Sequence, residues 1–301
     1  MDDAKRVGEV AQVAVEVAGA IGRIVLTRPE RGNAVTVQSC VELVDALDRL
    51  DGDDEVAVIL LQAQGRNFCV GADLEEGFQS EGRAWSPQFT AFVERFGLVD
   101  GVPRDPGGVV TLRIAALRKP LVVAVQGAAV GAGASMLLPC DIRVIADDAR
   151  IGFVFAKRGI ASESLASWLL PRVVGPTRAL DWVLTGRLVP AAEVEAAGLA
   201  THVVPREDVL ARAEAIAVQI AEGTSRVAAG VARQLIWGML GEQSPWEAHR
   251  IESQVVWQAA SGADVAEGVA SFLEKRAPQF PLRVPSDYPD YVPPWPGARP
   301  M

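Results

Sequence analysis

The most informative part of the sequence is Gln126-Gly127-Ala128-Ala129-Val130-Gly131-Ala132-Gly133-Ala134-Ser135. It follows an apolar run, Leu121 to Val125, that is typical of a buried strand, and it leads into a short helix that we expect to end at Pro139. Its small residues let the backbone approach a ligand closely, and free N–H groups at a helix start stabilise negative charge. Because Gly-rich turns often serve packing alone, this stretch gains meaning only from the rest of the chain.

A second Gly-containing stretch, Gly65-Arg66-Asn67-Phe68-Cys69-Val70-Gly71-Ala72-Asp73-Leu74, has the same setting. It follows the apolar run Val56 to Leu61, which predicts another buried strand. Before it, apolar residues recur at helical spacing from Thr36, a plausible N-cap, to Asp51-Gly52. The chain opens with a predicted hairpin, because Val13, Val15 and Val17 alternate and Ile21 to Leu26 is again strand-like. The repeated order of strand, helix and strand predicts an α/β chain.

Composition excludes several classes of function. The 29 Lys and Arg against 38 Asp and Glu give a net charge of −9, which disfavours nucleic acid and anionic membranes as partners. Cys40, Cys69 and Cys140 lie far apart, so we expect small core residues in a reducing compartment and neither disulfides nor a metal site. The acidic N-terminus shows no signal-peptide pattern, which predicts a cytoplasmic location. The apolar stretch 121–139 is rich in Gly and Ala, so a buried strand, turn and helix is favoured over a membrane span.

Few side chains are available for acid–base chemistry. The histidines, His202 and His249, lie in an apolar run and among helix-type residues, so we interpret both as structural. The tyrosines, Tyr288 and Tyr291, lie in a Pro-rich end, and no GxSxG, P-loop or HExxH motif is present. Acid–base chemistry should therefore fall to carboxylates.

The two Gly-containing stretches resemble, in order and spacing, the signature blocks of the crotonase (enoyl-CoA hydratase/isomerase) superfamily. Further matches run from about residue 24 to residue 280: Leu26-Thr27-Arg28-Pro29, Asn33-Ala34, Cys140-Asp141-Ile142, Glu267-Gly268-Val269 and Phe272 to Arg276. The resemblance implies an α/β (α+β) fold, the crotonase/ClpP-like spiral of ββα units, followed by helices that build a homotrimer or a dimer of trimers. It also implies an acyl-CoA substrate and no further cofactor.

The resemblance implies that an oxyanion hole is formed by the backbone N–H groups of Ala72 and Ala132, the latter in place of the usual Gly. Such fixed donors stabilise the enolate of a thioester by roughly 3 kcal/mol each in a water-poor site. Neighbouring positions of the two blocks are expected to line the acyl-CoA site: Val70, Gly71, Asp73, Leu74 and Gly131.

The two glutamates of the family's hydratases are replaced here by Ser135 and Phe155, which are thus expected only to contact substrate. The segment from Phe155 to Glu163 instead resembles the peroxisomal-type 3,2-enoyl-CoA isomerases, in which a single glutamate moves the proton. Glu163 takes that position and could serve both C2 and C4 of the acyl chain. The alternative is that Glu163 is a solvated residue in the first turn of the helix leading to Trp168, where it would face the helix dipole.

For CoA, the resemblance points to Arg66, to Arg28 as a weaker candidate, and to Phe272 and Lys275 reaching from an adjacent subunit. The alternative for each is an ordinary surface charge or a core aromatic. The mixed stretch 76–106 suits a lid over the acyl site or plain surface helices, and its aromatic residues are Phe78, Trp85, Phe89, Phe92 and Phe96.

Beyond Pro190 the periodicity is helical, with helices predicted over 191–197, 207–222, 227–240, 246–260 and 265–275. We expect residues 1–200 to form the spiral core with the active site, residues 201–280 a helical oligomerisation region, and residues 281–301 a Pro-rich tail that packs on a neighbour or stays loose. Three functions follow from the resemblance. The preferred one is isomerisation of 3-enoyl-CoA to 2-enoyl-CoA. The second is hydration or another enolate reaction such as thioester hydrolysis, and the third is a non-catalytic acyl-CoA-binding relative.

Overall fold

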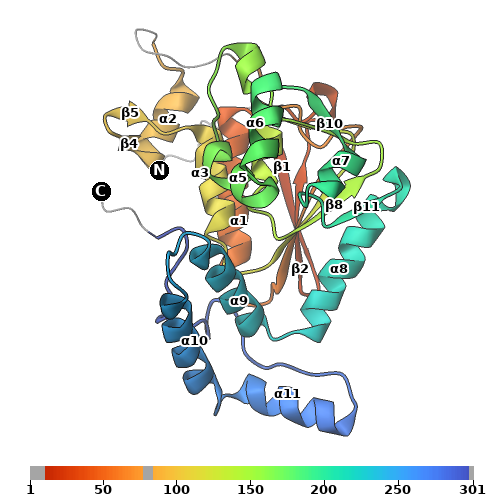
Figure 1. The fold of residues 1–301 in the computed structure, drawn as a ribbon, viewed down its shortest axis with the longest axis vertical. Helices are drawn as coiled ribbons and strands as arrows, with labels where there is room; N and C mark the ends of the chain where they lie inside the picture. The colour runs from red at the N-terminus through yellow and green to blue at the C-terminus, as the bar shows by residue number, and fades with distance from the viewer. Residues whose placement is uncertain (1–10, 77–83, 298–301) are drawn as a thin grey trace, which may run out of the picture.

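A central sheet organises the molecule (Figure 1). The computed structural model describes residues 11–76 and 84–297. Within them a six-stranded sheet has the order β1-β2-β3-β6-β8-β11. Its strands are β1 (Val13–Ala18), β2 (Ile21–Leu26), β3 (Val58–Ala63), β6 (Leu121–Val125), β8 (Ile142–Ala146) and β11 (His202–Val204). Only the β1–β2 pair is antiparallel, which confirms the predicted hairpin, and the other pairs are parallel.

A second, smaller sheet is made of three other strands. It has the order β10-β9-β7, made of β10 (Leu188–Pro190), β9 (Arg150–Gly152) and β7 (Ala128–Val130). Strand β7 follows β6 after a two-residue turn, and β9 follows β8 after three residues, so successive strand pairs step along both sheets. The segment after β3 also pairs with the smaller sheet, through an isolated parallel bridge between Cys69 and Ala129 of β7. The spiral of strand pairs and helices is the expected α/β crotonase fold.

Helices cover the central sheet. Helix α1 (Val37–Asp51) contacts β1 and β2, and α3 (Pro106–Ala115) packs against α1. The Thr36 hydroxyl oxygen accepts from the Ser39 N–H, and the Thr36 N–H donates to the Ser39 hydroxyl oxygen in return, so the predicted N-cap forms a full capping box. Helix α8 (Val209–Gly223) contacts β3, β6 and β8. The segment 76–106 contributes α2 (Pro87–Phe96) and a small hairpin of β4 (Leu98–Val99) and β5 (Val102–Pro103), while Phe78 lies outside the described residues.

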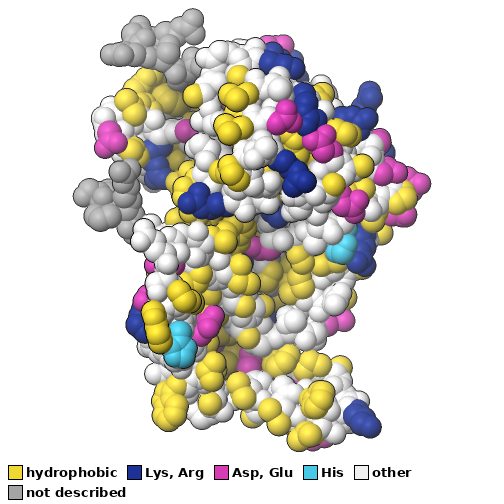
Figure 2. Space-filling model, viewed as in Figure 1, with side chains coloured by type: hydrophobic (Ala, Val, Ile, Leu, Met, Phe, Trp, Pro, Cys, Tyr) yellow, Lys and Arg dark blue, Asp and Glu magenta, His cyan; other side chains and the backbone are white. Residues whose placement is uncertain are grey.

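The C-terminal helices confirm the predicted periodicity. They are α9 (Arg226–Met239), α10 (Pro245–Ala259) and α11 (Ala263–Glu274), and they extend away from the central sheet (Figure 1). The remaining helices are α4 (Ala132–Met136), α5 (Ala166–Val174), α6 (Pro176–Thr185) and α7 (Ala191–Ala196). Apolar side chains lie exposed on α9 to α11, as the yellow surface of the lower part of Figure 2 shows: Ile236, Trp246, Val256, Trp257, Val269, Phe272 and Leu273.

The described part of the Pro-rich end packs on its own chain. The Trp295 ring stacks on Trp237 with ring centroids 5.3 Å apart and lies 5.5 Å from Trp168. The Trp295 N–H donates to Gln234 Oε1 at 2.6 Å. The alternative of a loose tail was therefore wrong for these residues, because the stacked tryptophans hold them on α9 and α5, a contact that the proline content does not indicate.

Two expectations about buried segments are confirmed. All three cysteines are free and buried. The stretch 121–139 folds as a buried strand, a short strand and a short helix, and no helix of the described residues is long and apolar enough to cross a membrane.

Candidate active site

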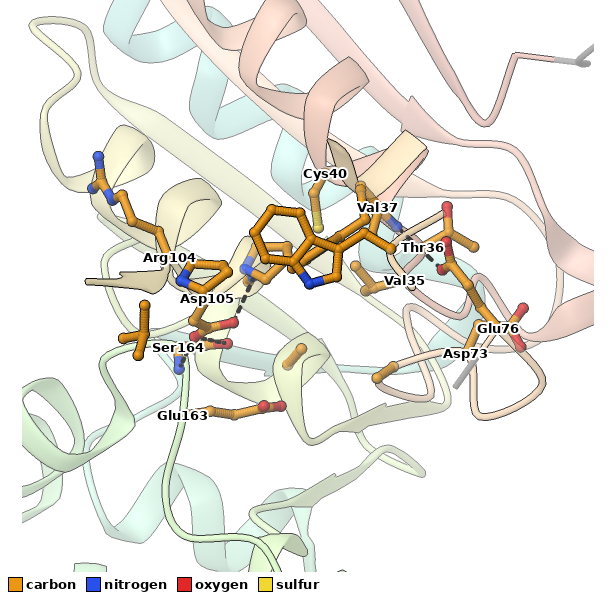
Figure 3. Close-up of a pocket in the computed structure, with 18 of the residues that line it drawn as sticks. Val35, Thr36, Val37, Cys40, Asp73, Glu76, Arg104, Asp105, Glu163 and Ser164 are labelled. Carbon is orange, nitrogen blue, oxygen red and sulfur yellow. Dashed lines mark hydrogen bonds between the residues drawn. The ribbon is translucent and has the colours of Figure 1, made fainter. Parts of the chain in front are cut away.

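A cavity of about 580 Å³ opens beside the start of α1 (Figure 3). Its walls come from segments that are distant in sequence but meet at one end of the fold. The lining residues are Val35, Thr36, Val37, Cys40, Ala72, Asp73, Glu76, Trp85, Phe89, Gly101, Val102, Pro103, Arg104, Asp105, Pro106, Gly107, Ala132, Glu163 and Ser164. The cavity thus brings together Ala72, Asp73, Ala132 and Glu163 from the predicted site, and the 76–106 segment supplies one of its walls.

Ala72 presents its N–H group away from the neighbouring backbone. In the parallel bridge to Val35, the Val35 N–H donates to the Gly71 carbonyl and the Asp73 N–H donates to the Val35 carbonyl, both at 2.8 Å. The residue between two such bonds directs its own N–H to the opposite side. Accordingly, the Ala72 N–H has no backbone or side-chain acceptor among the described residues. It is available to a ligand.

Ala132 is the first residue of α4 and has a free N–H for a different reason. The first N–H groups of a helix have no partner inside the helix. The Gly131 carbonyl accepts from Ala134 and Ser135, both at 3.0 Å, whereas the Ala132 N–H has no acceptor in the described part of the chain. Gly131 precedes it with φ 54°, a conformation that side chains rarely adopt.

Missing side chains let the two segments approach each other. A Cβ atom on Gly71 would lie 3.0 Å from the Val130 carbonyl oxygen, and one on Gly133 would lie 2.5 Å from the Cys69 carbonyl oxygen. Any side chain at Gly133 would therefore push the segments apart. Their contact is what allows Ala72 and Ala132 to open onto one cavity.

Glu163 lies three residues before α5, outside the helix, and lines the cavity. The alternative prediction of a solvated residue in the first helical turn was wrong, because the helix begins later than the sequence pattern indicates. Burial raises the pKa of Glu163 to about 7, and the negative charge of Asp105 adds to the effect. A carboxyl group with a pKa near neutrality can both accept and donate a proton.

Two carboxylates in the cavity were missed by the sequence reasoning. Glu76 accepts from the Val37 N–H at 3.2 Å, and burial raises its pKa. Asp105 caps α3 by accepting from the N–H groups of Gly107 and Gly108. An Asp before Pro-Gly-Gly is an ordinary helix-start signal, so nothing local in the sequence marks it as part of a site.

Asp73 and Arg28 are held by the chain itself. The Asp73 carboxylate lies 3.0 Å from Arg28 Nη2 and 3.5 Å from Arg31 Nη2. Burial would raise the pKa of Asp73, but the bonds from Arg28 and from the Glu75 N–H hold it below its usual value. Arg28 also donates to the Ala34 carbonyl at 2.9 Å, so its guanidinium braces the loop beside the cavity.

Other predicted site residues lie elsewhere. Ser135 is fully buried and donates to the Gly131 carbonyl at 3.2 Å, and Phe155 is buried near Phe153, so the structure does not bring either of them to the cavity wall. Val70 and Leu74 are exposed and do not line the cavity.

The predicted CoA contacts are surface residues within one chain. Arg66 is exposed on the loop after β3, where its carbonyl accepts from Arg206 Nη1 at 3.0 Å. Phe272, 81% exposed, and Lys275 lie at the end of α11, a helix that extends away from the central sheet (Figure 1). None of these three residues lines the cavity within the described chain.

Comparison with known proteins gives consistent results. A family model described as enoyl-CoA hydratase/isomerase matches residues 16–283. Enoyl-CoA hydratase ACTT3 of Alternaria alternata is 38% identical over 264 residues, which cover 87% of this chain and 83% of that protein. The 1,2-epoxyphenylacetyl-CoA isomerase of Escherichia coli is 32% identical, over 85% of this chain and 93% of that protein. A crystal structure of a putative enoyl-CoA hydratase from Streptomyces coelicolor superimposes with a TM-score of 0.80 at 27% identity, over 93% of this chain and 98% of that chain.

Proposed function

Because the chain belongs to the enoyl-CoA hydratase/isomerase family and is thus an acyl-CoA enzyme, we propose that it converts a 3-enoyl-CoA into the 2-enoyl-CoA. One observation carries this proposal. Glu163, with a pKa raised to about 7, lines the same cavity as Ala72 and Ala132, whose N–H groups have no acceptor among the described residues.

The reaction uses these groups in sequence. The thioester oxygen accepts from the Ala72 and Ala132 N–H groups, and the Glu163 carboxylate removes a proton from C2. The electron pair of the broken C–H bond passes into a dienolate whose charge gathers on the thioester oxygen. Return of the proton from Glu163 to C4 restores the thioester carbonyl and leaves the double bond between C2 and C3. Each fixed donor contributes roughly 3 kcal/mol to the stability of the dienolate.

The resemblance to the peroxisomal-type isomerases supports a single proton carrier. The two positions that the hydratases use for glutamates hold Ser135 and Phe155 here, and both side chains are buried away from the cavity. Glu163 then acts alone, which suits isomerisation because the proton that leaves C2 returns to C4.

Conversion of 3-enoyl-CoA to 2-enoyl-CoA tests the proposal directly. We expect Glu163→Gln to lower kcat by about 100-fold or more, because the amide cannot carry the proton. The matched control is Glu207→Gln, an exposed residue whose replacement should leave the rate unchanged. Equal rates for wild type and Glu163→Gln would remove Glu163 from the mechanism.

Hydration is the second candidate, favoured by the names of the curated relatives and by the Asp105 and Glu163 carboxylates in one cavity. Incubation with 2-enoyl-CoA and mass analysis for the 3-hydroxyacyl product decides between them. Release of free CoA in the same samples would indicate thioester hydrolysis instead. Absence of enzyme-dependent exchange of the α-proton in heavy water would leave a non-catalytic acyl-CoA-binding protein.

We further propose assembly into a homotrimer or a dimer of trimers. The exposed apolar side chains of α9 to α11 support it, because surfaces of this kind are usually covered by protein. Assembly would bring Phe272 and Lys275 to the CoA bound by a neighbour, beside its Arg66. Sedimentation velocity measures the assembly, and Lys275→Ala should raise KM for acyl-CoA with little change in kcat.

A further inference from the structure

We propose that Asp105 is the positioning residue of this site, which fixes the backbone beside Glu163 and places a second carboxyl group in the same cavity. The inference rests on the proposed function, in which Glu163 carries the proton. Asp105 lies 59 positions away in the sequence from its hydrogen-bond partner Ser164, and the sequence pattern indicates only that Asp105 caps a helix.

Asp105 makes more bonds than capping requires. Its Oδ1 accepts from the Gly107 N–H and its Oδ2 from the Gly108 N–H, each at 3.0 Å, and these two bonds cap α3. The same Oδ2 also accepts from the Ser164 N–H at 2.7 Å and lies 3.4 Å from Ser164 Oγ. One carboxylate therefore ties the start of α3 to the residue that follows Glu163.

The tie holds a strained turn in place. Ser164 and Leu165 have φ values of 53° and 62°, so two successive non-glycine residues adopt the left-handed conformation. Each costs about 1–2 kcal/mol and persists only where the surroundings impose it. The bond from Asp105 restrains Ser164, and the Glu163 carbonyl accepts from the Ala166 N–H at 3.0 Å on the other side.

Gly107 makes room for this contact. A Cβ atom at Gly107 would lie 2.3 Å from Ser164 Oγ, so a side chain there would force the Ser164 hydroxyl to move away from Asp105. The turn leaves Glu163 outside α5 and directs its side chain along the cavity wall, next to the bond between Asp105 and Ser164 (Figure 3).

The second effect of Asp105 is electrostatic. Its oxygens accept from three backbone N–H groups, two of them at a helix start. Its negative charge adds to burial in raising the pKa of Glu163.

The other titratable groups around Glu163 do not share this role. Cys40 on α1 keeps its proton, because burial raises the pKa of the thiol well above its usual value. Glu76 lies across the cavity on the segment after β3, and Arg104 precedes Asp105 on the same wall (Figure 3). Among the described residues, the charge that raises the pKa of Glu163 is that of Asp105.

The raised pKa of Glu163 suits a single proton carrier. Glu163 must be ionised to take the C2 proton and protonated to deliver it to C4. A pKa near the working pH balances the two steps, whereas a more acidic carboxyl would be a weaker base at C2. Loss of the charge of Asp105 should therefore weaken Glu163 as a base even if the turn stays intact.

The test compares Asp105→Asn and Asp105→Ser with wild type. Asn and Ser are both good N-caps and neither is charged, so the start of α3 should survive. We expect the acidic limb of kcat/KM for the isomerisation to move to lower pH in both variants. The plateau should fall about tenfold to 100-fold in Asp105→Ser, because its single short hydroxyl cannot replace both carboxylate oxygens and the Ser164 N–H loses its acceptor. Two controls should leave the limb in place: Ser164→Ala, which keeps the N–H, and Asp208→Asn, an exposed acid at the start of α8.

A second readout is independent of turnover. The infrared band of the protonated Glu163 carboxyl, assigned by subtracting the spectrum of Glu163→Gln, gives its titration directly. Titration at lower pH in the folded Asp105 variants supports the proposal, and an unchanged titration in either folded variant overturns it. Full activity of Glu163→Gln would instead refute the proposed function, and the infrared titration would still decide the role of Asp105.

Discussion

Replacement of Ala132 by proline removes a single donor from the site and leaves the helix that carries it. Ala132 is the first residue of α4, the position where proline is best tolerated because its missing N–H has no helical partner. That N–H is the one proposed to hold the thioester oxygen. Loss of one such donor costs about 2.7–4 kcal/mol in the transition state. We therefore expect kcat to fall by about 100-fold to 1,000-fold with little change in the melting temperature.

The measurement is the steady-state rate of 3-enoyl-CoA isomerisation together with thermal unfolding. Ala263→Pro is the matched control, because Ala263 is also the first residue of a helix that follows a glycine, and it is exposed on α11. The proline ring could also obstruct the cavity, so a second variant replaces residue 132 by lactic acid, which exchanges the amide for an ester without adding a ring. A folded ester variant with the wild-type kcat would refute the use of this N–H.

The other predictions address the base, the contact between the two Gly-containing segments, and the core. Since Glu163 must be ionised to act and its pKa is raised to about 7, kcat/KM should rise with pH through about 7 and level off above it, and a rate independent of pH from 5.5 to 8.5 would contradict this. Gly133→Ala should lower activity at least tenfold and, in chemical denaturation, destabilise the fold by about 1–3 kcal/mol, because its Cβ would lie 2.5 Å from the Cys69 carbonyl oxygen. The control is Gly223→Ala, where the added Cβ would have no atom within 4 Å, and it should be neutral or stabilising in the same experiment. Arg233→Met should cost about 3–5 kcal/mol in chemical denaturation, because the buried guanidinium donates to the carbonyls of Ile114, Ala115 and Leu117 and to the Asp141 carboxylate. Arg250→Met on exposed α10 should leave the free energy of unfolding nearly unchanged in the same experiment.

Local signals predicted the elements well. Thr36 and Gly52 bound a helix in the sequence and in the structure, because capping depends on neighbouring residues only. The alternation from Val13 to Val17 predicted a strand, because this signal too depends only on residues that are close in sequence. The three-residue strands β7, β9 and β10 were not predicted, since so short a run carries no periodicity.

The site was predictable where family resemblance or backbone geometry determines it. Ala72, Ala132 and Glu163 do line one cavity, as expected of residues in the signature blocks and the isomerase-like segment. Asp105 and Glu76 could not be predicted, because their approach depends on how distant segments pack. The placement of Trp295 on Trp237 is hidden from sequence for the same reason.

The free N–H groups of residues 72 and 132 belong to the main chain, and no substitution other than proline removes a main-chain N–H. Mutation at these positions can reshape the wall of the cavity while the charge-accepting dipoles stay where the fold puts them. Substitutions can therefore change which acyl group the cavity accepts without removing the N–H donors. Related enzymes can in this way change substrate without passing through an inactive form. A scaffold of this kind is a favourable starting point for laboratory evolution toward new thioesters.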